Sequence, residues 1–514
     1  MNGNRDRATE HLDVLIVGAG LSGIGTARHL QERCPGKSFA ILEARDDLGG
    51  TWDLFRYPGI RSDSDMNTLG YRFKPWMGGE ELADGPSILS YIREAAREGG
   101  IEGRIRFRHR VVAAEWSSAD ERWTVEAERT DTGERLRIVC GFLAMCSGYY
   151  SYDQGYTPEF PGIERFEGPV VHPQQWPDDL DYKGKRVVVI GSGATAVTLV
   201  PALAEKAARV VQLQRSPSYV ITIPNVDPVA DWLRHRLPER AAYAVVRWKS
   251  IVMQTIVYQL SRRRPKLMRR LLRRGVMRSL PPGYDVDTHF NPRYDPWDQR
   301  LCMVPDADLF EAISSGTAEI VTDRIATFDE RGIELESGNR LDADIVITAT
   351  GLNVLFLGGA VLTVDGEQVD VAATKAYKGM MLSGVPNMVF TLGYTNASWT
   401  LKADLTSEYL CRLLSHMNAH GYGEARPIPD TSVEEEPVID LTAGYVLRAL
   451  PNLPKQGTRE PWKLRQNYFM DVRTIRRGAI EDGAMQFSAA AAPELVDRDL
   501  PVRDGESGYA GRAA

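Results

Sequence analysis

Apolar residues along this chain cluster in short, almost unbroken runs that end directly at glycine-rich segments. The run Leu12–Val17 leads into glycines at residues 18–23, and apolar positions with helical spacing follow as far as residue 30. The same order returns at Arg186–Ile190 and residues 191–203. A short apolar run bounded by turn residues is typical of a buried parallel strand, and a period of 3.6 is typical of a helix. The pattern therefore predicts an α/β fold with two Rossmann-like dinucleotide-binding domains.

The first glycine segment has the spacing G-x-G-x-x-G, formed by Gly18, Gly20 and Gly23. Gly18 permits a tight turn, Gly20 lets the backbone approach a pyrophosphate, and Gly23 lets the helix pack closely on the strand. The helix amino terminus, where Ser22 also lies, adds the positive end of its dipole. Glu43 ends the next predicted strand, where its carboxylate can accept hydrogen bonds from both hydroxyls of an unphosphorylated ribose. The unit predicts a dinucleotide site of the FAD type.

The second glycine segment is the G-x-G-x-x-A variant, made of Gly191, Ser192, Gly193, Ala194, Thr195 and Ala196. Here the following strand ends at Arg215 and Ser216 rather than at an acid. An acid at this place repels a 2′-phosphate, whereas a guanidinium pairs with one. The second unit therefore predicts an NADP site. The alternative is that Arg215 is an ordinary solvent-exposed residue at the end of a strand and binds no phosphate.

A sharper signal lies between the two units, in a stretch that reads F-x-G-x-x-x-H-x-x-x-W-P. Its fixed positions are Phe166, Gly168, His172 and Trp176, followed by a proline. A chance match in a chain of this length has odds on the order of 10⁻⁴. The alternative is a surface loop that holds one histidine and one tryptophan. The glycine segments on both sides favour a functional motif.

Composition narrows the class of protein. The 514 residues, 43% of them hydrophobic, suffice for two or three domains, and the net charge of −7 gives no reason to expect nucleic acid. The polar amino terminus and the short first apolar run indicate neither a signal peptide nor a spanning helix, so we expect a cytoplasmic protein. The five cysteines form no C-x-x-C pair, which excludes a zinc site recognisable from cysteine spacing, and we expect no bound metal.

Two dinucleotide sites on one chain imply electron transfer from NADPH to a flavin. Disulfide reductases of this architecture need a cysteine pair beside the flavin, and residues 43–65 contain no cysteine. Molecular oxygen is therefore the electron acceptor that the sequence favours.

Two further segments, Gly49–Asp63 and Asp344–Gly351, accompany the Phe166 to Pro177 stretch. With these three signatures the chain resembles the type I Baeyer–Villiger monooxygenases. Three more segments are similar to the ethionamide-activating actinobacterial subgroup of that family: Gly191–Pro201, Tyr294–Cys302 and Tyr394–Asp404. The resemblance extends from about Leu12 to about Phe487.

The resemblance implies a FAD-containing enzyme that uses NADPH and O₂ to convert ketones to esters or lactones through a C4a-peroxyflavin. It also implies oxygenation of sulfur in thioethers and thioamides. Flavin N-hydroxylating monooxygenases remain an alternative, although their motif lacks the tryptophan found here at Trp176. Alternatives of another class are an NADPH oxidase or reductase flavoprotein and a non-catalytic NADP(H) sensor. The sequence does not determine the oligomeric state, and a homo-oligomer is one of the alternatives.

The resemblance assigns the catalytic roles to Arg300 and Asp63. Arg300 would stabilise the anionic peroxide and then its adduct with the ketone, because an anion in a dry cavity needs a fixed positive partner. Asp63 would orient this arginine and contact the flavin. The alternatives are an ordinary ion pair between domains and a different carrier of the charge, Arg293.

Further positions take their roles from the same resemblance. Those expected near FAD are Thr51, Trp52, Asp53, Asp63 and Val111. Arg61 and Ser62 are expected on the nicotinamide side of NADP. His172 is interpreted as a hinge residue between the domains rather than as a general base. Gln299 replaces a lysine that many relatives place at the 2′-phosphate, so the NADPH preference depends on Arg215 and Ser216.

These anchors divide the chain into segments. The FAD-binding domain takes residues 10–150 and 351–487, and the NADP-binding domain takes 152–220 and 295–350. A helical insert covers residues 221–292, and a disordered tail is expected at 488–514. Antiparallel strands at Arg110–Glu128 and Leu136–Cys146 are expected as an appendage of the FAD-binding domain. The chain crosses twice between the domains, which permits relative rotation.

The helical insert has an unusual charge, because no acid occurs between Arg240 and Asp285. Its basic residues are Arg262, Arg263, Arg264, Lys266, Arg269, Arg270, Arg273, Arg274 and Arg278, which alternate with Leu267, Leu271, Leu272 and Val276. We favour an amphipathic helix that packs on the core, with its basic face in solvent or against a partner subunit. The alternative is a helix on a membrane surface, which would give weak peripheral contact with lipid.

Overall fold

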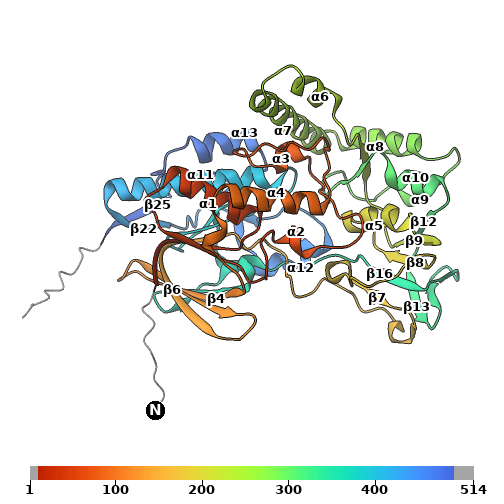
Figure 1. Ribbon diagram of the computed structural model, residues 1–514, viewed down its shortest axis with the longest axis horizontal. Coiled ribbons are helices and arrows are strands. Elements are labelled where there is room, and N and C mark those ends of the chain that lie inside the picture. Colours follow the sequence, from red (N-terminus) through yellow and green to blue (C-terminus); the bar gives the residue numbers. More distant parts are fainter. Residues whose placement is uncertain (1–9, 491–514) are drawn as a thin grey trace, which may run out of the picture.

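A computed structural model describes residues 10–490 of the chain. Figure 1 shows two α/β units side by side, one toward the left of the view and one toward the right. The first unit contains residues 10–150 and 351–490, and the second contains residues 152–350. The chain passes between them twice. The predicted fold class, two Rossmann-like units with a helical insert, is confirmed.

The sheet of the first unit is built around β1, Glu10–Val17. This strand pairs in parallel with β2, Phe39–Leu42, on one side and with β6, Arg135–Met145, on the other. The central apolar residues of β1 have no exposed surface, which explains their unbroken hydrophobic run. α1, Leu21–Arg33, connects β1 to β2 and packs against the long helix α11.

The antiparallel strands of the first unit are not the appendage that the sequence predicted. β6 has 11 residues, and its first half pairs with β5, Arg122–Arg129, which in turn pairs with β4, His109–Ser117. From Ile138 onward β6 also pairs with β1, so a single nine-stranded sheet results. The sheet is completed by β3 (Ile105–Arg106), β17 (Val361–Val364), β18 (Glu367–Gln368) and β21 (Met388–Phe390).

The second unit has a five-stranded parallel sheet in the order β12-β9-β8-β16-β7. Its strands are Ala318–Thr322, Arg209–Gln214, Arg186–Ile190, Ile345–Thr348 and Val170–Val171 in that order. α5, Ala194–Ala204, and α10, Asp308–Ser314, pack together beside it. β7 belongs to the F-x-G-x-x-x-H-x-x-x-W-P stretch, so this motif forms an edge of the second sheet. A small antiparallel sheet follows, made of β13 (Ile325–Asp329), β14 (Gly332–Leu335) and β15 (Arg340–Asp342).

The helical insert leaves and re-enters the second unit through two neighbouring parallel strands, β10 (Val220–Ile223) and β11 (Cys302–Pro305). Its helices are α6 (Pro228–Arg234), α7 (Glu239–Arg263), α8 (Pro265–Ser279) and α9 (Val286–His289). α6 and α7 form the upper edge of the view in Figure 1.

Buried polar contacts and apolar packing hold the insert in place. Arg247 of α7 is 6% exposed and donates hydrogen bonds to the carbonyl oxygens of Asn67 and Gly70, both at 2.7 Å. One face of α8 is buried through Met268, Leu272 and Val276, while Leu267 and Leu271 are exposed. Three arginines of the basic face, Arg262, Arg269 and Arg273, pair with Asp298, Asp295 and Asp287 respectively. This is the packed arrangement that the sequence analysis favoured.

The carboxyl-terminal part of the described chain returns to the first unit. α11, Trp399–His420, ends at Gly421 in the left-handed conformation, and β22, Tyr422–Pro427, then pairs with β25, Met485–Ala489. The disordered tail predicted at 488–514 therefore begins too early, because Ser488 and Ala489 belong to β25. The rest of that tail, residues 491–514, lies outside the described residues.

The remaining short elements fill the connections between these layers. They are α2 (Thr51–Leu54), α3 (Met66–Leu69), α4 (Gly85–Glu98), β19 (Ala376–Tyr377), β20 (Met381–Leu382), β23 (Glu435–Pro437), α12 (Gly444–Ala449), β24 (Lys455–Gly457) and α13 (Tyr468–Asp471). Within residues 10–490, no helix combines the length and the apolar character needed to cross a lipid bilayer.

Candidate active site

A cavity of about 490 Å³, called the long cavity below, extends from the β1–α1 turn of the first unit to α5 of the second. Most of the predicted site residues of the first unit line it. These are Gly18, Gly20, Ser22, Glu43, Thr51, Trp52, Arg61, Ser62, Asp63 and Val111, and the second unit contributes Ala194, Thr195 and Arg300. The other predicted residues lie outside its wall: Gly23, Asp53, Gly191, Ser192, Gly193, Ala196, Arg215 and Ser216.

The first glycine turn leaves no room for a side chain at Gly18 or Gly23. Gly18 has φ +101°, and a Cβ there would lie 2.5 Å from the carbonyl oxygen of Cys146. A Cβ on Gly23 would overlap the carbonyl oxygen of Gly18, which confirms the close packing of helix and strand. Gly20 is the N-cap of α1 and supplies no side-chain cap. The first N–H groups of the helix are therefore free to bind an anionic group in the cavity.

Glu43 stands at the carboxyl end of β2 on the wall of the long cavity. Its two carboxylate oxygens accept hydrogen bonds from the backbone N–H of Ala19 at 2.7 Å and of Arg45 at 3.0 Å. Burial raises the pKa of this carboxyl group. The two backbone donors hold the carboxylate in one orientation, and each oxygen retains a further lone pair for a ligand hydroxyl.

Arg300 and Asp63 come from different units and meet on the wall of the long cavity. A guanidinium nitrogen of Arg300 lies 3.2 Å from an Asp63 carboxylate oxygen, and the side chains are 32% and 37% exposed toward the cavity. The charge of Asp63 raises the pKa of Arg300, so this arginine is a permanent cation. Tyr149 and Tyr150 lie nearby, and burial raises the pKa of both phenols, so both stay neutral. Arg293, the alternative carrier, is exposed and lines none of the cavities around Arg300.

A second pocket of about 370 Å³, called the Arg300 pocket below, lies beside the helical insert and shares Asp63, Arg300 and Met303 with the long cavity. Its wall is mostly apolar, with Ile221, Ile223, Met253, Val257, Trp297 and Leu301. Arg300 thus stands where the two spaces meet, and it can place positive charge between a group in one and a group in the other. Sequence reasoning missed this pocket, because its wall joins α7 to β10 and β11.

The second glycine turn has the same backbone form, but most of it faces away from the long cavity. Gly191 has φ +145°, and a Cβ there would overlap the carbonyl oxygen of Ala349. Gly193 caps α5 without a side-chain hydrogen bond, so the N–H groups of this helix are also free. Arg215 and Ser216 are exposed, and Arg215 has no hydrogen-bond or ion-pair partner among residues 10–490. The arrangement leaves Arg215 available for a phosphate.

Arg61 lies between these two ends of the site. One of its nitrogens pairs with Asp308 at 2.6 Å, while its Nε and its other terminal nitrogen are buried without a partner. Buried donors of this kind are rare in folded proteins unless a ligand or water satisfies them. They fit the polar part of a dinucleotide that extends from α5 into the long cavity.

Asp53 is not among the residues that line the long cavity, and its expected position near FAD stays a prediction. Its carboxylate accepts a hydrogen bond from Arg45 at 2.7 Å, and the side chain is 7% exposed. Arg45 itself lines the long cavity. Asp53 is therefore placed to orient Arg45.

The F-x-G-x-x-x-H-x-x-x-W-P stretch also lies outside both cavities, at the edge of the second sheet and in contact with the second crossing. Phe166 packs on Phe328, and a Cβ on Gly168 would overlap the carbonyl oxygen of Asp344. His172 accepts a hydrogen bond at Nδ1 from the backbone N–H of Gln174 at 3.2 Å, so its Nε2–H donates to the carbonyl of Gly351 at 3.1 Å. Burial lowers the pKa of His172, which favours this neutral form.

Gly351 begins the second crossing, so His172 ties the edge of the second sheet to that crossing. Trp176 contacts the edge of Tyr182, with ring centroids 6.4 Å apart. The motif is thus a structural joint between the units. A hinge role for His172 stays a prediction.

Several aromatic residues of the site were not identified from the sequence. Trp399, the first residue of α11, donates from Nε1 to Ser22 Oγ at 2.8 Å and stacks on Tyr149 with ring centroids 5.2 Å apart. Tyr152 approaches Thr51, with 3.4 Å between their oxygens. Trp399 falls in the segment Tyr394–Asp404 that carried the family resemblance, and that segment was the signal available.

Comparison with known proteins agrees with this geometry. The family description "Flavin-binding monooxygenase-like" matches residues 81–381, and "NAD(P)-binding Rossmann-like domain" matches residues 16–76. FAD-containing monooxygenase EthA of Mycobacterium tuberculosis (strain ATCC 25618 / H37Rv) is 57% identical over 487 residues, which are 94% of this chain and 99% of EthA. Putative FAD-containing monooxygenase MymA of the same strain is 51% identical over 94% of this chain and 98% of its own length.

Two solved structures share the fold at lower identity. An oxidized steroid monooxygenase bound to NADP superposes with a TM-score of 0.75 at 23% identity and covers 93% of this chain and 100% of its own. Cyclohexanone monooxygenase from Rhodococcus sp. Phi1, bound to NADP⁺, gives 0.72 at 18% identity and covers 94% and 100%. The family resemblance found in the sequence is confirmed by the close relatives. With more than half of its length matched by the family description, the chain belongs to the flavin-binding monooxygenases.

Proposed function

We propose that this flavin monooxygenase contains FAD, uses NADPH and O₂, and catalyses Baeyer–Villiger oxidation of ketones to esters or lactones, with S-oxygenation of thioethers and thioamides as a second reaction. The observation that carries the proposal is the position of Arg300, held by Asp63 at the junction of the long cavity and the Arg300 pocket. An oxidase or a reductase does not need a fixed cation between a cofactor site and a substrate pocket.

The residues of the first unit fit FAD. The free N–H groups of α1 suit the pyrophosphate, and the fixed carboxylate of Glu43 suits the ribose hydroxyls. Thr51, Trp52 and Val111 line the same cavity. When bound, the flavin would take a hydride from the nicotinamide and activate O₂. Trp399, hydrogen-bonded to Ser22, closes one side of this space.

The second unit fits NADP(H). The free amino terminus of α5 suits its pyrophosphate, and exposed Arg215, with Ser216 beside it, suits the 2′-phosphate. The unpartnered nitrogens of Arg61 point to a polar contact near the nicotinamide. Gln299 offers no charge to the phosphate, so discrimination against NADH depends on Arg215.

Arg300 acts on charge that develops during oxygen transfer. Its guanidinium stays protonated, so it donates N–H bonds to an oxygen that becomes negative as the substrate carbonyl is attacked. Asp63 keeps the guanidinium in place between turnovers and offsets its charge when the site is empty. Removing one preorganised donor of this kind costs about 10² to 10³ in rate.

The Arg300 pocket supports a substrate with an apolar body and at least one hydrogen-bond donor. Asp65 and Glu81 stand on its wall, and burial raises the pKa of both carboxyls. Asn67 donates to Glu81 at 2.8 Å, which leaves the second oxygen of Glu81 open to a ligand. The volume lies in the range of small-molecule sites.

A rapid-mixing experiment tests the proposal without a substrate. The flavoprotein is reduced with NADPH in the absence of air and is then mixed with oxygenated buffer while the flavin spectrum is recorded. We expect an absorbing species, distinct from reduced and oxidised flavin, that persists for seconds and disappears faster when a ketone or a sulfide is present. Direct return to oxidised flavin with release of hydrogen peroxide would favour an oxidase and remove the role given to Arg300.

A further inference from the structure

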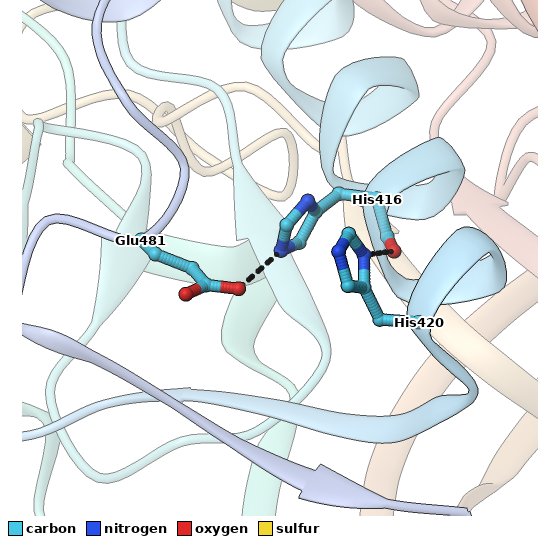
Figure 2. A group of neighbouring side chains, drawn as sticks. All are labelled: His416, His420 and Glu481. Carbon is cyan, nitrogen blue, oxygen red and sulfur yellow. Dashed lines mark hydrogen bonds and ion pairs between the residues drawn. The ribbon is translucent and has the colours of Figure 1, made fainter.

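A second group of chemically active side chains lies at the end of α11. His416 and His420 are one helical turn apart, and Glu481 approaches them from the loop before β25 (Figure 2). His416 Nε2 lies 2.9 Å from Glu481 Oε1, and the candidate ligand atoms of the three residues all lie within 4.8 Å of one another. Among residues 10–490, no other group of three such side chains meets this distance criterion. We propose that these residues, called the His–Glu cluster below, bind a divalent transition-metal ion of the zinc class.

The hydrogen bonds of the cluster select the nitrogen that faces the metal. His420 Nδ1 lies 2.9 Å from the carbonyl oxygen of His416, and a carbonyl can only accept, so Nδ1 carries the proton. Its Nε2 is then an unprotonated lone pair, free to coordinate. Metal-binding histidines generally donate their second ring N–H to a carbonyl or carboxylate in this way. The tautomer needed for coordination is therefore already present in His420, whereas His416 Nε2, which donates to the carboxylate of Glu481, would release its proton when the metal binds.

Neighbouring contacts hold the three groups together independently of a metal. Arg412, one turn before His416 on the same face of α11, donates to the carbonyl oxygens of Ile475 and Gly478 and fixes the loop that leads to Glu481. The ring of Tyr422 stacks on His420 at 5.5 Å, and Phe487 packs on the edge of His416 at 5.4 Å. The carboxyl end of α11 adds the negative end of the helix dipole, which favours a cation.

The donor set favours zinc and its neighbours over magnesium and calcium. Two imidazole nitrogens suit Zn²⁺, Ni²⁺, Co²⁺ and Cu²⁺, whereas Mg²⁺ and Ca²⁺ prefer oxygen donors. With metal–ligand bonds of about 2.0 to 2.2 Å, the donor atoms of a tetrahedral site lie roughly 3.4 Å apart. The Glu481 side chain is 54% exposed, so it can move to reach that spacing. Water would complete the coordination.

A bound ion would join the end of α11 to the loop before β25, so it would act as a clip at this corner of the first unit. The five cysteines are buried free thiols and do not compete for an ion at the surface. His416 and His420 show helical spacing in the sequence, but Glu481 joins them only through the fold. The expectation of no bound metal was based only on the spacing of the cysteines.

Zinc binding to the full-length, untagged flavoprotein tests the proposal. Isothermal titration with ZnCl₂ alone is compared for the native chain, His416→Ala, His420→Ala and Glu481→Gln. The matched control is His235→Ala, because His235 also bonds a carbonyl one turn back through Nδ1 at 2.7 Å but has no second histidine beside it. Retention on an immobilised zinc column and the Zn²⁺-dependent rise in melting temperature are measured in parallel.

We expect one Zn²⁺ per chain, at least about tenfold weaker binding in His416→Ala and His420→Ala, and unchanged binding in the control. The melting temperature of the native chain should rise with Zn²⁺, because the ion binds the folded state. Equal affinity in the native chain and both histidine variants would overturn the proposal. The proposal would also be overturned if His235→Ala weakened Zn²⁺ binding as much as His416→Ala and His420→Ala do. All the substituted side chains are partly or fully exposed, so the variants should fold.

Discussion

Replacement of Arg300 by alanine tests the guanidinium at the junction of the two cavities. If this group stabilises negative charge during oxygen transfer, ketone oxygenation should fall about 10²- to 10³-fold, equivalent to about 2.7 to 4 kcal/mol of transition-state stabilisation. Reduction of the flavin by NADPH should persist, because the other residues assigned to FAD and NADP(H) are unchanged. The variant should therefore consume NADPH and release hydrogen peroxide instead of forming an ester.

The loss should not reflect unfolding. Unit charges 3.2 Å apart interact by about 5 kcal/mol at an effective dielectric of 20 and by about 1 kcal/mol in water. The side chains are 32% and 37% exposed, so solvent screening places the value near the lower figure. We expect the melting temperature to fall by only a few degrees. A loss of stability of that size would not account for the expected loss of activity.

The assay measures NADPH consumption, hydrogen peroxide and ester in the same reaction, with flavin content as the basis for comparison. Arg293→Ala is the matched control, because Arg293 is exposed and lines none of the cavities around Arg300. Arg300→Lys separates charge from geometry, since a lysine keeps the cation but loses the planar set of donors. The reasoning is refuted if Arg300→Ala keeps more than about a tenth of the ester yield per flavin, or if Arg293→Ala loses as much.

Three further predictions concern other parts of the molecule. Arg215→Ala should raise the KM for NADPH at least about tenfold while leaving the KM for NADH unchanged, and steady-state kinetics with both cofactors checks this. Burial lowers the pKa of His172, so the native state favours its neutral form and should lose stability as pH falls below about 6.5. His172→Gln should flatten that slope in denaturation curves, and an unchanged slope would contradict the assignment. The basic insert should give no flotation with anionic liposomes at physiological salt, because acids neutralise part of its charged face; flotation there would instead support the membrane alternative.

The sequence by itself determined the local units. Gly18 and Gly23 occupy places where a Cβ would strike a backbone carbonyl, so the requirement for glycine is visible in the sequence and its reason is steric. Glu43 can be identified from the sequence because the second strand of such a unit ends about twenty residues after the glycine turn. The strands β1 and β8 are equally clear, since burial on both faces demands an unbroken apolar run.

The tertiary structure decided everything that depends on contacts between distant segments. Arg300 and Asp63 belong to different units, and no local pattern shows that they meet; only the resemblance linked them. The Arg300 pocket needs α7, β10 and β11 together, so its residues share no periodicity. The ion pair between Asp53 and Arg45 also depends on the folded arrangement, and the sequence contains no sign of it.

Strand pairing and the His–Glu cluster also depend on contacts between segments that are distant in the sequence. The sequence predicts that Leu136–Cys146 is extended, but only the register of β6 with β1 and β5 joins the meander to the dinucleotide-binding sheet. Likewise, the spacing of His416 and His420 is local, whereas Glu481 reaches them through the pairing of β22 with β25. Backbone geometry restricts neighbouring residues directly, whereas distant residues meet only through the packing of the whole chain.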